Sequence, residues 1–101
     1  MFDILSEARQ EGLKAARWCE EHQRGLGEQF LDELQAAFER IAADPGSLGR
    51  LELYSGHYDV RRYHLKRFPY SAIFYTRRDD VIVVAVCHSR RRPLYWAGRL
   101  K

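Results

Sequence analysis

The sequence predicts an α+β domain in which a helical hairpin packs on a small antiparallel sheet. Apolar residues recur at steps of three and four up to about residue 44, which is typical of amphipathic helices. Beyond about residue 58 the period becomes two, and β-branched and aromatic residues predominate. A chain of 101 residues has the common size of one domain, so we expect residues 1–101 to form a single domain.

The first half predicts a strand followed by two helices. Phe2 to Leu5 is apolar and can form an edge strand, and the Ser6 side chain can cap the first helix. One face of this helix is apolar and made mostly of small residues: Leu5, Ala8, Gly12, Ala15, Ala16 and Cys19. Because its side chains are small, this face allows another helix or a sheet to approach closely. Gly25-Leu26-Gly27 then breaks the chain.

The second helix is predicted from a wide apolar stripe that Asp44-Pro45-Gly46 ends. The stripe contains Phe30, Leu31, Leu34, Ala37, Phe38, Ile41 and Ala42. Phe38 lies in its middle, so we expect this ring to pack between the helix and the sheet, and Phe38→Ala to cost about 3 to 5 kcal/mol. The short connection between the helices predicts an antiparallel hairpin.

The second half predicts three strands, over residues 59–65, 70–76 and 81–87. Leu48, Leu51, Leu53 and Tyr54 are expected to hold the preceding connection on the core. Breaks at residues 68–69 and 77–80 indicate an antiparallel meander. The last strand is apolar on both faces, which predicts a central position, and the chain is expected to end in a short helix or a tail.

Charge divides the chain into two unequal halves. Residues 1–56 carry 6 Lys and Arg against 11 Asp and Glu, whereas residues 57–101 carry 11 against 3, within a net charge of +3. A basic half of this kind suggests an acidic partner, such as nucleic acid, a ribosome or an acidic protein segment.

The sequence argues against a membrane protein, a secreted protein and a metalloprotein. No apolar run approaches the roughly 18 residues of a membrane span, and a basic segment followed by an apolar run is absent from the N-terminus, so we expect a cytoplasmic protein. Cys19 and Cys87 are expected to be buried free thiols. Since neither the cysteines nor the histidines show ligand spacing, no metal or cofactor is predicted.

Two sets of side chains could carry function. Alternation along the strand at 59–65 places Arg62, His64 and Lys66 on one face, opposite Tyr63 and Leu65. This basic stripe suits phosphates and stacked bases, although solvated charges on an exposed strand give the same pattern.

The second set lies where the last strand ends and comprises His88, Arg90, Arg91 and Tyr95. Histidine or tyrosine could transfer protons while arginine stabilises a phosphate, which together could cleave RNA through attack of the 2′-hydroxyl. Alternatively, His88 only bonds the strand end, the arginines are solvated, and Tyr95 with Trp96 fills the core.

Segments along nearly the whole chain follow the pattern of a known family. In the helical half they lie at residues 7–18, 25–34 and 41–45. The more specific segments are Arg61-Arg62, Arg67-Phe68-Pro69-Tyr70, Ile73-Phe74-Tyr75, Val81 to Val86 and His88-Ser89-Arg90-Arg91-Arg92-Pro93-Leu94-Tyr95-Trp96. In these segments the chain resembles RelE/ParE superfamily toxins. The resemblance implies a βααβββ fold, a cognate antitoxin as partner, and growth inhibition when the antitoxin is degraded.

The resemblance leaves the target open between DNA gyrase and the ribosome with its mRNA. RelE-like toxins cut messenger RNA, and Arg90 and Tyr95 match two of their catalytic positions, with His88 beside them. The arginine that these enzymes carry on the middle strand falls near Ser71 or Ala72 here, and the chain looks closer to ParE-like inhibitors of gyrase. A degenerate toxin that only binds its antitoxin and helps repress the operon is a further alternative. The residues expected to bind the target, nucleic acid or the antitoxin are Arg61, Arg62, His64, Lys66, Arg67 and Arg91.

Overall fold

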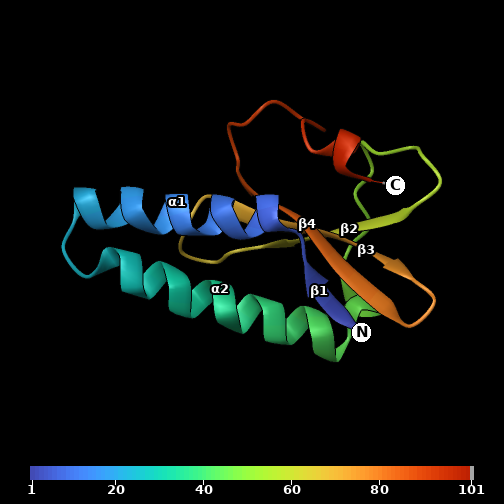
Figure 1. Cartoon of the computed structure of the whole chain (residues 1–101), viewed down its shortest axis with the longest axis horizontal. Coiled ribbons are helices and arrows are strands. Elements are labelled where there is room, and N and C mark those ends of the chain that lie inside the picture. The colour runs from blue at the N-terminus through green and yellow to red at the C-terminus, as the bar shows by residue number, and fades with distance from the viewer. Residues whose placement is uncertain (101) are drawn as a thin grey trace.

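A computed structural model describes residues 1–100 and contains the predicted α+β arrangement (Figure 1). The regular elements are β1 (Phe2–Ile4), α1 (Ser6–His22), α2 (Leu26–Ala43), β2 (Asp59–His64), β3 (Tyr70–Arg77) and β4 (Asp80–His88), with short 3-10 helices at Pro45–Ser47 and Ala97–Arg99. The helical hairpin, the edge strand at the N-terminus and the meander of three strands are thus confirmed.

The four strands form one sheet in the order β1-β4-β3-β2. β2 pairs with β3 and β3 with β4, both antiparallel, while the short β1 pairs in parallel with β4 at residues Val81–Val83. β4 is therefore an interior strand over its first half, in agreement with its apolar sequence. Beyond Val83 this strand extends past the end of β1.

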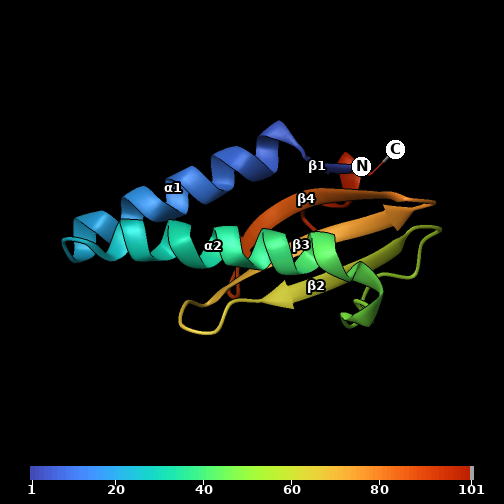
Figure 2. The ribbon, with the colours of Figure 1, turned by 90° about the horizontal axis from the view of Figure 1, so that it is seen from below.

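The two helices cover one face of the sheet, and their small residues allow them to pack closely (Figure 2). A Cβ added at Gly12 would lie 2.9 Å from Leu34 Cδ2, and one added at Gly27 would lie 2.6 Å from the Ala16 carbonyl oxygen. Glycine is required at Gly27, where the close atom belongs to the backbone, whereas a Cβ at Gly12 would force the Leu34 methyl group to shift. The prediction of close approach is confirmed.

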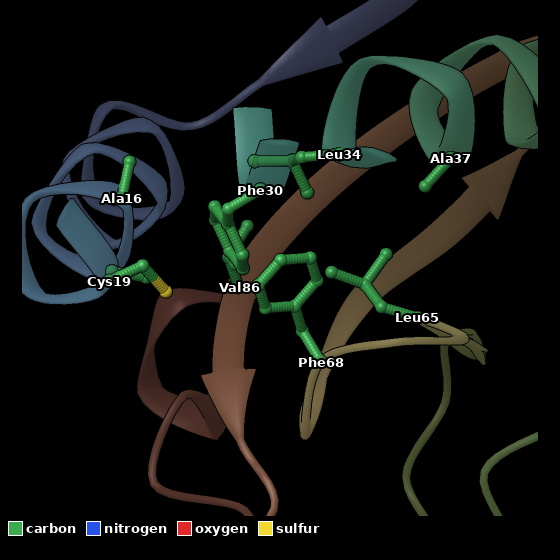
Figure 3. Close-up of a cluster of buried hydrophobic side chains, with 9 residues drawn as sticks. Ala16, Cys19, Phe30, Leu34, Ala37, Leu65, Phe68 and Val86 are labelled. Atoms are coloured by element: carbon green, nitrogen blue, oxygen red, sulfur yellow. The ribbon is translucent and has the colours of Figure 1, made fainter. Parts of the chain in front are cut away.

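The core between the hairpin and the sheet is built around aromatic rings (Figure 3). Phe30 is fully buried, and its ring meets those of Phe68 and Tyr70 edge to face, with both centroid distances 5.1 Å. Phe38 is only partly buried, because it lies at the flank of α2 beside Phe2. Phe38 still packs against the core between α2 and the sheet, as expected, but the fully buried ring of the stripe is Phe30.

The C-terminal segment covers the opposite face of the sheet. Trp96 is 2% exposed and packs there with Val60, Ile73, Val84 and Ala85. The predicted short C-terminal helix is confirmed at Ala97–Arg99, and Trp96 directly before it belongs to the core of this second face. The sheet is consequently buried on both sides.

A β-bulge in β4 decides which side chains face the helices. The pairing register shifts between Ile73 and Phe74, so that Val84 and Ala85 both pack on the side of the C-terminal segment. Val86 and His88 then face the helical side, whereas Cys87 faces the other. Without the bulge, regular alternation would place Val86 and His88 on the side of the C-terminal segment and Cys87 on the helical side.

Three smaller expectations are corrected. Ser6 is the first residue of α1 and makes no capping bond to the backbone, because Leu5 occupies the cap position. Leu53 is 67% exposed and does not hold the connection on the core. Cys19 is buried, but Cys87 is only partly so, since it borders a cleft.

Candidate functional site at the basic end of the sheet

Most of the predicted basic residues gather at one end of the sheet. The β2–β3 loop and the turn after β4 lie side by side there, because the Ser89 N–H donates to the Pro69 carbonyl oxygen at 2.8 Å and Tyr70 pairs with His88. We call the resulting cationic surface the basic end. Its members are Arg62, His64, Lys66, Arg67, Arg90, Arg91 and Arg92.

A basic cleft of about 180 Å³ opens on the side of the C-terminal segment. Its walls carry Arg62, His64, Arg91 and Arg92, and Ser71 and Cys87 lie between them. His64 Nδ1 and Ser71 Oγ are 2.8 Å apart and share a hydrogen bond. Burial raises the pKa of the Cys87 thiol, and Glu11 adds to this effect, which outweighs the opposing influence of Arg62 and Arg91. The cleft can thus bind an anion, but its thiol stays protonated near neutral pH.

The β2–β3 loop is fixed to α2 by Glu33. Its carboxylate accepts the backbone N–H groups of Lys66 at 2.6 Å and Arg67 at 3.1 Å, and pairs with the Arg67 guanidinium at 3.1 Å. Burial acts to raise the pKa of Glu33, but the hydrogen bonds from Arg67 and Lys66 and the Arg67 charge outweigh it and lower the pKa. Lys66 is left exposed to solvent, while Arg67 is held against the helix.

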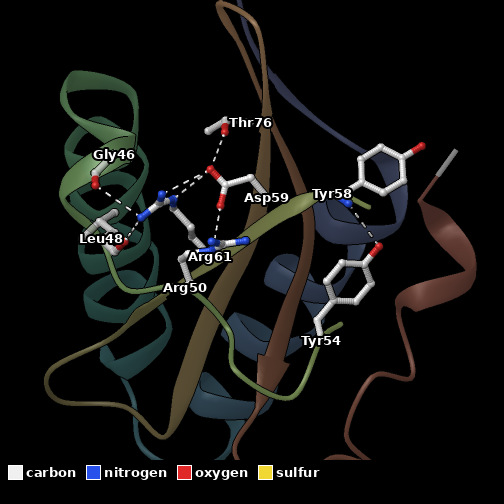
Figure 4. A network of polar contacts seen from close by, with 8 residues as sticks. All are labelled: Gly46, Leu48, Arg50, Tyr54, Tyr58, Asp59, Arg61 and Thr76. Carbon is white, nitrogen blue, oxygen red and sulfur yellow. Dashed lines mark hydrogen bonds and ion pairs between the residues drawn. The ribbon is translucent and has the colours of Figure 1, made fainter. Parts of the chain in front are cut away.

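Arg61 lies apart from the basic end, in a polar network beside the outer edge of β2 (Figure 4). Its guanidinium bonds Asp59 Oδ2 at 3.2 Å and donates to the carbonyl oxygens of Gly46 and Leu48. The same carboxylate accepts the Thr76 hydroxyl and pairs with Arg50. Arg61 therefore holds the connection after α2 on the sheet, and Arg62 is the member of the pair that faces the basic cleft.

Tyr95 is held by a carboxylate from the first helix. Its hydroxyl donates to Glu11 Oε2 at 2.7 Å, and the same carboxylate forms two bonds of 3.0 Å with Arg99. Burial, followed by the hydrogen bond to Glu11, strongly raises the pKa of Tyr95. Arg91 lies over the Tyr95 ring, 4.0 Å from its centroid. This phenol is a structural anchor that keeps its proton.

His88 faces the helical side of the sheet. Its Nδ1 accepts the backbone N–H of Arg90 at 3.0 Å, and its ring meets Tyr70 edge to face at 5.0 Å. Since an N–H can only donate, Nδ1 is the acceptor in this bond. Within residues 1–100 no hydrogen bond joins the side chains of His88 or Arg90 to Tyr95. His88 and Tyr95 nevertheless both border the basic cleft, whereas Arg90 is not among the residues that line it.

Glu11 and Arg99 are the site residues that sequence reasoning missed. They lie 88 positions apart, and neither belongs to a motif, so only the fold places them in contact. In the part of the chain that the structure describes, no group of three or more His, Cys, Asp or Glu side chains is placed to hold a metal ion, and no helix is long and apolar enough to cross a membrane.

Comparison with known proteins gives two findings. A family model described as "ParE toxin of type II toxin-antitoxin system, parDE" matches residues 3–93. Among solved structures, a chain of the chromosomal ParDE toxin–antitoxin system from P. aeruginosa is similar, with a TM-score of 0.64 and 20% identity over 86% of this chain and 92% of that one. No curated protein matches the chain. At this identity the structural likeness supports the fold, while the family model covers most of the sequence.

Proposed function

The chain belongs to the ParE toxin family of type II toxin–antitoxin systems, and from this premise we propose that it stops growth by inhibiting DNA gyrase. In this proposal the protein acts by binding, without cleaving messenger RNA. A cognate antitoxin, encoded beside it, neutralises the toxin.

The hydrogen bond and the raised pKa of Tyr95 are the main reason to favour gyrase over messenger RNA as the target. A general base for the 2′-hydroxyl must give up its proton near neutral pH and must reach the reacting oxygen. The Tyr95 hydroxyl instead donates to Glu11, and its pKa is raised by burial and by that bond. Tyr95 is therefore unsuited to act as a base.

The middle strand of the meander, β3, also favours gyrase inhibition over RNA cleavage. Ser71 occupies the region where RelE-like enzymes carry a phosphate-binding arginine, and it is 5% exposed and bonded to His64. A missing transition-state donor commonly reduces the rate about a hundredfold to a thousandfold. Arg62 and Arg91 can still bind phosphate or acidic side chains, and His64 and His88 border the same cleft, but the arginine of the middle strand has no counterpart here.

The charge of the basic end supports an acidic antitoxin. Its seven named side chains are arginine, lysine or histidine, and four of them, Arg62, His64, Arg91 and Arg92, line a cleft that can accept carboxylates. The similar solved chain comes from a ParDE system, in which toxin and antitoxin form the pair that its name describes. We expect the antitoxin to cover the basic end and to hold it away from the target.

Two assays on one preparation test the proposal. Purified toxin is added to gyrase during plasmid supercoiling, and to translating ribosomes followed by mapping of messenger RNA ends. We expect inhibited supercoiling or trapped cleaved DNA, with intact messenger RNA. Codon-positioned cuts that disappear in Arg90→Ala would overturn the proposal in favour of a ribosome-dependent endoribonuclease. Absence of toxicity in cells, with antitoxin binding retained, would instead indicate a degenerate toxin that acts only as a co-repressor.

A further inference from the structure

Arginines near the sheet differ in whether a carboxylate neutralises them. Four of them have such a partner: Arg50 and Arg61 pair with Asp59, Arg67 with Glu33, and Arg99 with Glu11. Within residues 1–100, the guanidinium groups of Arg62, Arg91 and Arg92 form no ion pair and no hydrogen bond. All three line the basic cleft. Three unpaired guanidinium groups thus share one concave site.

The lining of the basic cleft contains no acidic side chain. Besides the three arginines it includes two histidines, His64 and His88, but no Asp or Glu. Glu11, which acts on the Cys87 thiol from outside the lining, is paired with Arg99. Because a concave surface lined by cations focuses positive potential, the cleft attracts an anion.

Two of the arginines approach the cleft from separate elements. Arg62 belongs to β2, whereas Arg91 lies in the turn after β4, and both charges act on the thiol of Cys87 between them. Arg91 also lies over the Tyr95 ring, whose hydroxyl is held by Glu11. This contact restrains Arg91 before any ligand arrives, which reduces the entropy lost on binding.

A histidine adds a donor to the cleft. Ser71 is 5% exposed, and its hydroxyl lies 2.8 Å from His64 Nδ1. Within residues 1–100, Nε2 of the same ring has no hydrogen-bond partner. When the Ser71 hydroxyl donates to Nδ1, Nε2 carries the proton and can donate to an anion.

The size of the cleft indicates one group of a longer chain. Its volume of about 180 Å³ lies below the roughly 300 Å³ at which pockets for free small molecules begin. A phosphodiester has two non-bridging oxygens, which suit guanidinium groups on either side. A polymer that carries a charge on every unit also reaches further cations, such as Arg92.

The position of the cleft favours a nucleic acid over an acidic peptide. An extended peptide binds through its backbone to the open edge of a sheet. The basic cleft instead lies on the face that the C-terminal segment covers, where Ser71 and Cys87 of adjacent strands pair with each other. Strand backbone groups bond within the sheet there, so side chains supply the donors. A phosphate backbone needs nothing more.

We propose that the basic cleft binds a phosphate of the DNA backbone between Arg62 and Arg91, with His64 donating a further hydrogen bond. The contact reaches no base edge, so binding is independent of sequence. The toxin then contacts the DNA that gyrase holds as well as the enzyme itself. This inference rests on the proposed function, because it assigns the cleft to the DNA of the gyrase complex.

DNA binding by the free toxin tests the cleft without gyrase. The anisotropy of a short labelled DNA duplex is measured with wild type, with Arg62→Ala plus Arg91→Ala, and with Arg77→Ala plus Arg78→Ala. The last pair removes the same charge from the exposed β3–β4 turn at the opposite end of the sheet. We expect the cleft pair to weaken binding at least tenfold more than the turn pair, and to make it less dependent on salt.

Three results of this measurement would overturn the inference. They are absence of DNA binding by wild type at low salt, an equal loss in both pairs of variants, and RNA of the same sequence binding at least tenfold more tightly than DNA. Since Arg62 and Arg91 are exposed and unpaired, both pairs should fold, which circular dichroism checks.

Nuclear magnetic resonance locates the contact in the unaltered protein. Wild-type toxin labelled with ¹⁵N is titrated with the same duplex, and separately with a hexaglutamate peptide. We expect the DNA to shift the amide signals of Cys87, Ser89 and Arg91, while those of the β3–β4 turn stay in place. Shifts confined to other residues would overturn the cleft as the site. Equal or larger shifts with hexaglutamate would assign it to a carboxylate partner and overturn the phosphate.

Gyrase supercoiling distinguishes failure of this inference from failure of the proposed function. The cleft pair of variants should need at least a tenfold higher concentration than wild type to inhibit supercoiling, and the turn pair should not. If the cleft pair inhibits as well as wild type, the DNA contact is not used and the inference falls, while gyrase remains the target. If wild type itself does not inhibit, the proposed function fails, and DNA binding by the free toxin then decides the inference alone.

Discussion

Replacing Glu11 by alanine should destabilise the protein more than any other exposed or half-exposed substitution on α1. The Glu11 carboxylate joins three distant parts of the chain. It accepts the Val86 N–H, the Tyr95 hydroxyl and two N–H groups of Arg99, at 2.7 to 3.0 Å. The Glu11 and Arg99 side chains are 16% and 19% exposed, so water can replace little of what is lost.

The expected loss of stability follows from the charged and polar groups that Glu11→Ala leaves without a partner. Removing one partner of a buried ion pair costs about 3 to 5 kcal/mol, because an uncompensated charge remains. The residual exposure of Arg99 places Glu11→Ala near the lower limit, at about 3 kcal/mol. Tyr95→Phe removes a single hydroxyl and should cost about 1 to 1.5 kcal/mol.

Urea unfolding at pH 7 measures both changes, with Glu21→Ala as an exposed control on the same helix that should fall within about 0.5 kcal/mol of wild type. In the Glu11→Ala background, Tyr95→Phe should cost almost nothing, because its bonding partner is gone. A loss below about 1 kcal/mol for Glu11→Ala, or additive losses in the double variant, would refute the reasoning.

Three further outcomes are expected from the fold. Phe30→Ala should cost about 3 to 5 kcal/mol in chemical denaturation, and Phe38→Ala only about 1 to 2, since its ring is half-buried; equal losses would contradict the core assignment. Glu33 has a lowered pKa in the folded state, so its contribution is present above the unfolded pKa near 4.3 and lost as pH falls through the folded pKa. The gap in unfolding free energy between wild type and Glu33→Gln should therefore close in acid, and a gap unchanged from pH 7 to pH 2 would exclude this. Arg61→Ala should lower the melting temperature while Arg62→Ala leaves it nearly unchanged, and the reverse order would reject the network around Asp59.

The elements of the fold could be predicted because each depends on local periodicity. The stripe of α2 and the alternation of Tyr63 with Arg62 and His64 are features of short segments, and the structure confirms them. The bulge in β4 could not be predicted, because Val84 and Ala85 are apolar and suit either face. Counting by twos from Val81 would therefore place the residues near the strand end on the wrong side.

The site was less accessible to sequence reasoning because its contacts are long-range. Alternation on β2 did not show that Arg61 would be bound by Asp59 and the carbonyl oxygens of the preceding connection. Tyr95 was predicted either to transfer protons or to fill the core, but Glu11, which accepts its hydroxyl and adds to the effect of burial on its pKa, lies 84 positions away. The chemistry of a phenol follows from its partner, and the partner becomes visible only in the folded chain.

Gyrase supercoiling provides the most direct test of the central claim that this toxin acts by binding gyrase. Relaxed plasmid is incubated with gyrase and increasing toxin, alone and after the toxin has been mixed with an equimolar amount of its antitoxin. The account predicts inhibition by free toxin, inhibition retained in Tyr95→Phe as long as the variant is folded, and relief by the antitoxin. Full supercoiling at every toxin concentration, with the same preparation toxic in cells, would contradict it.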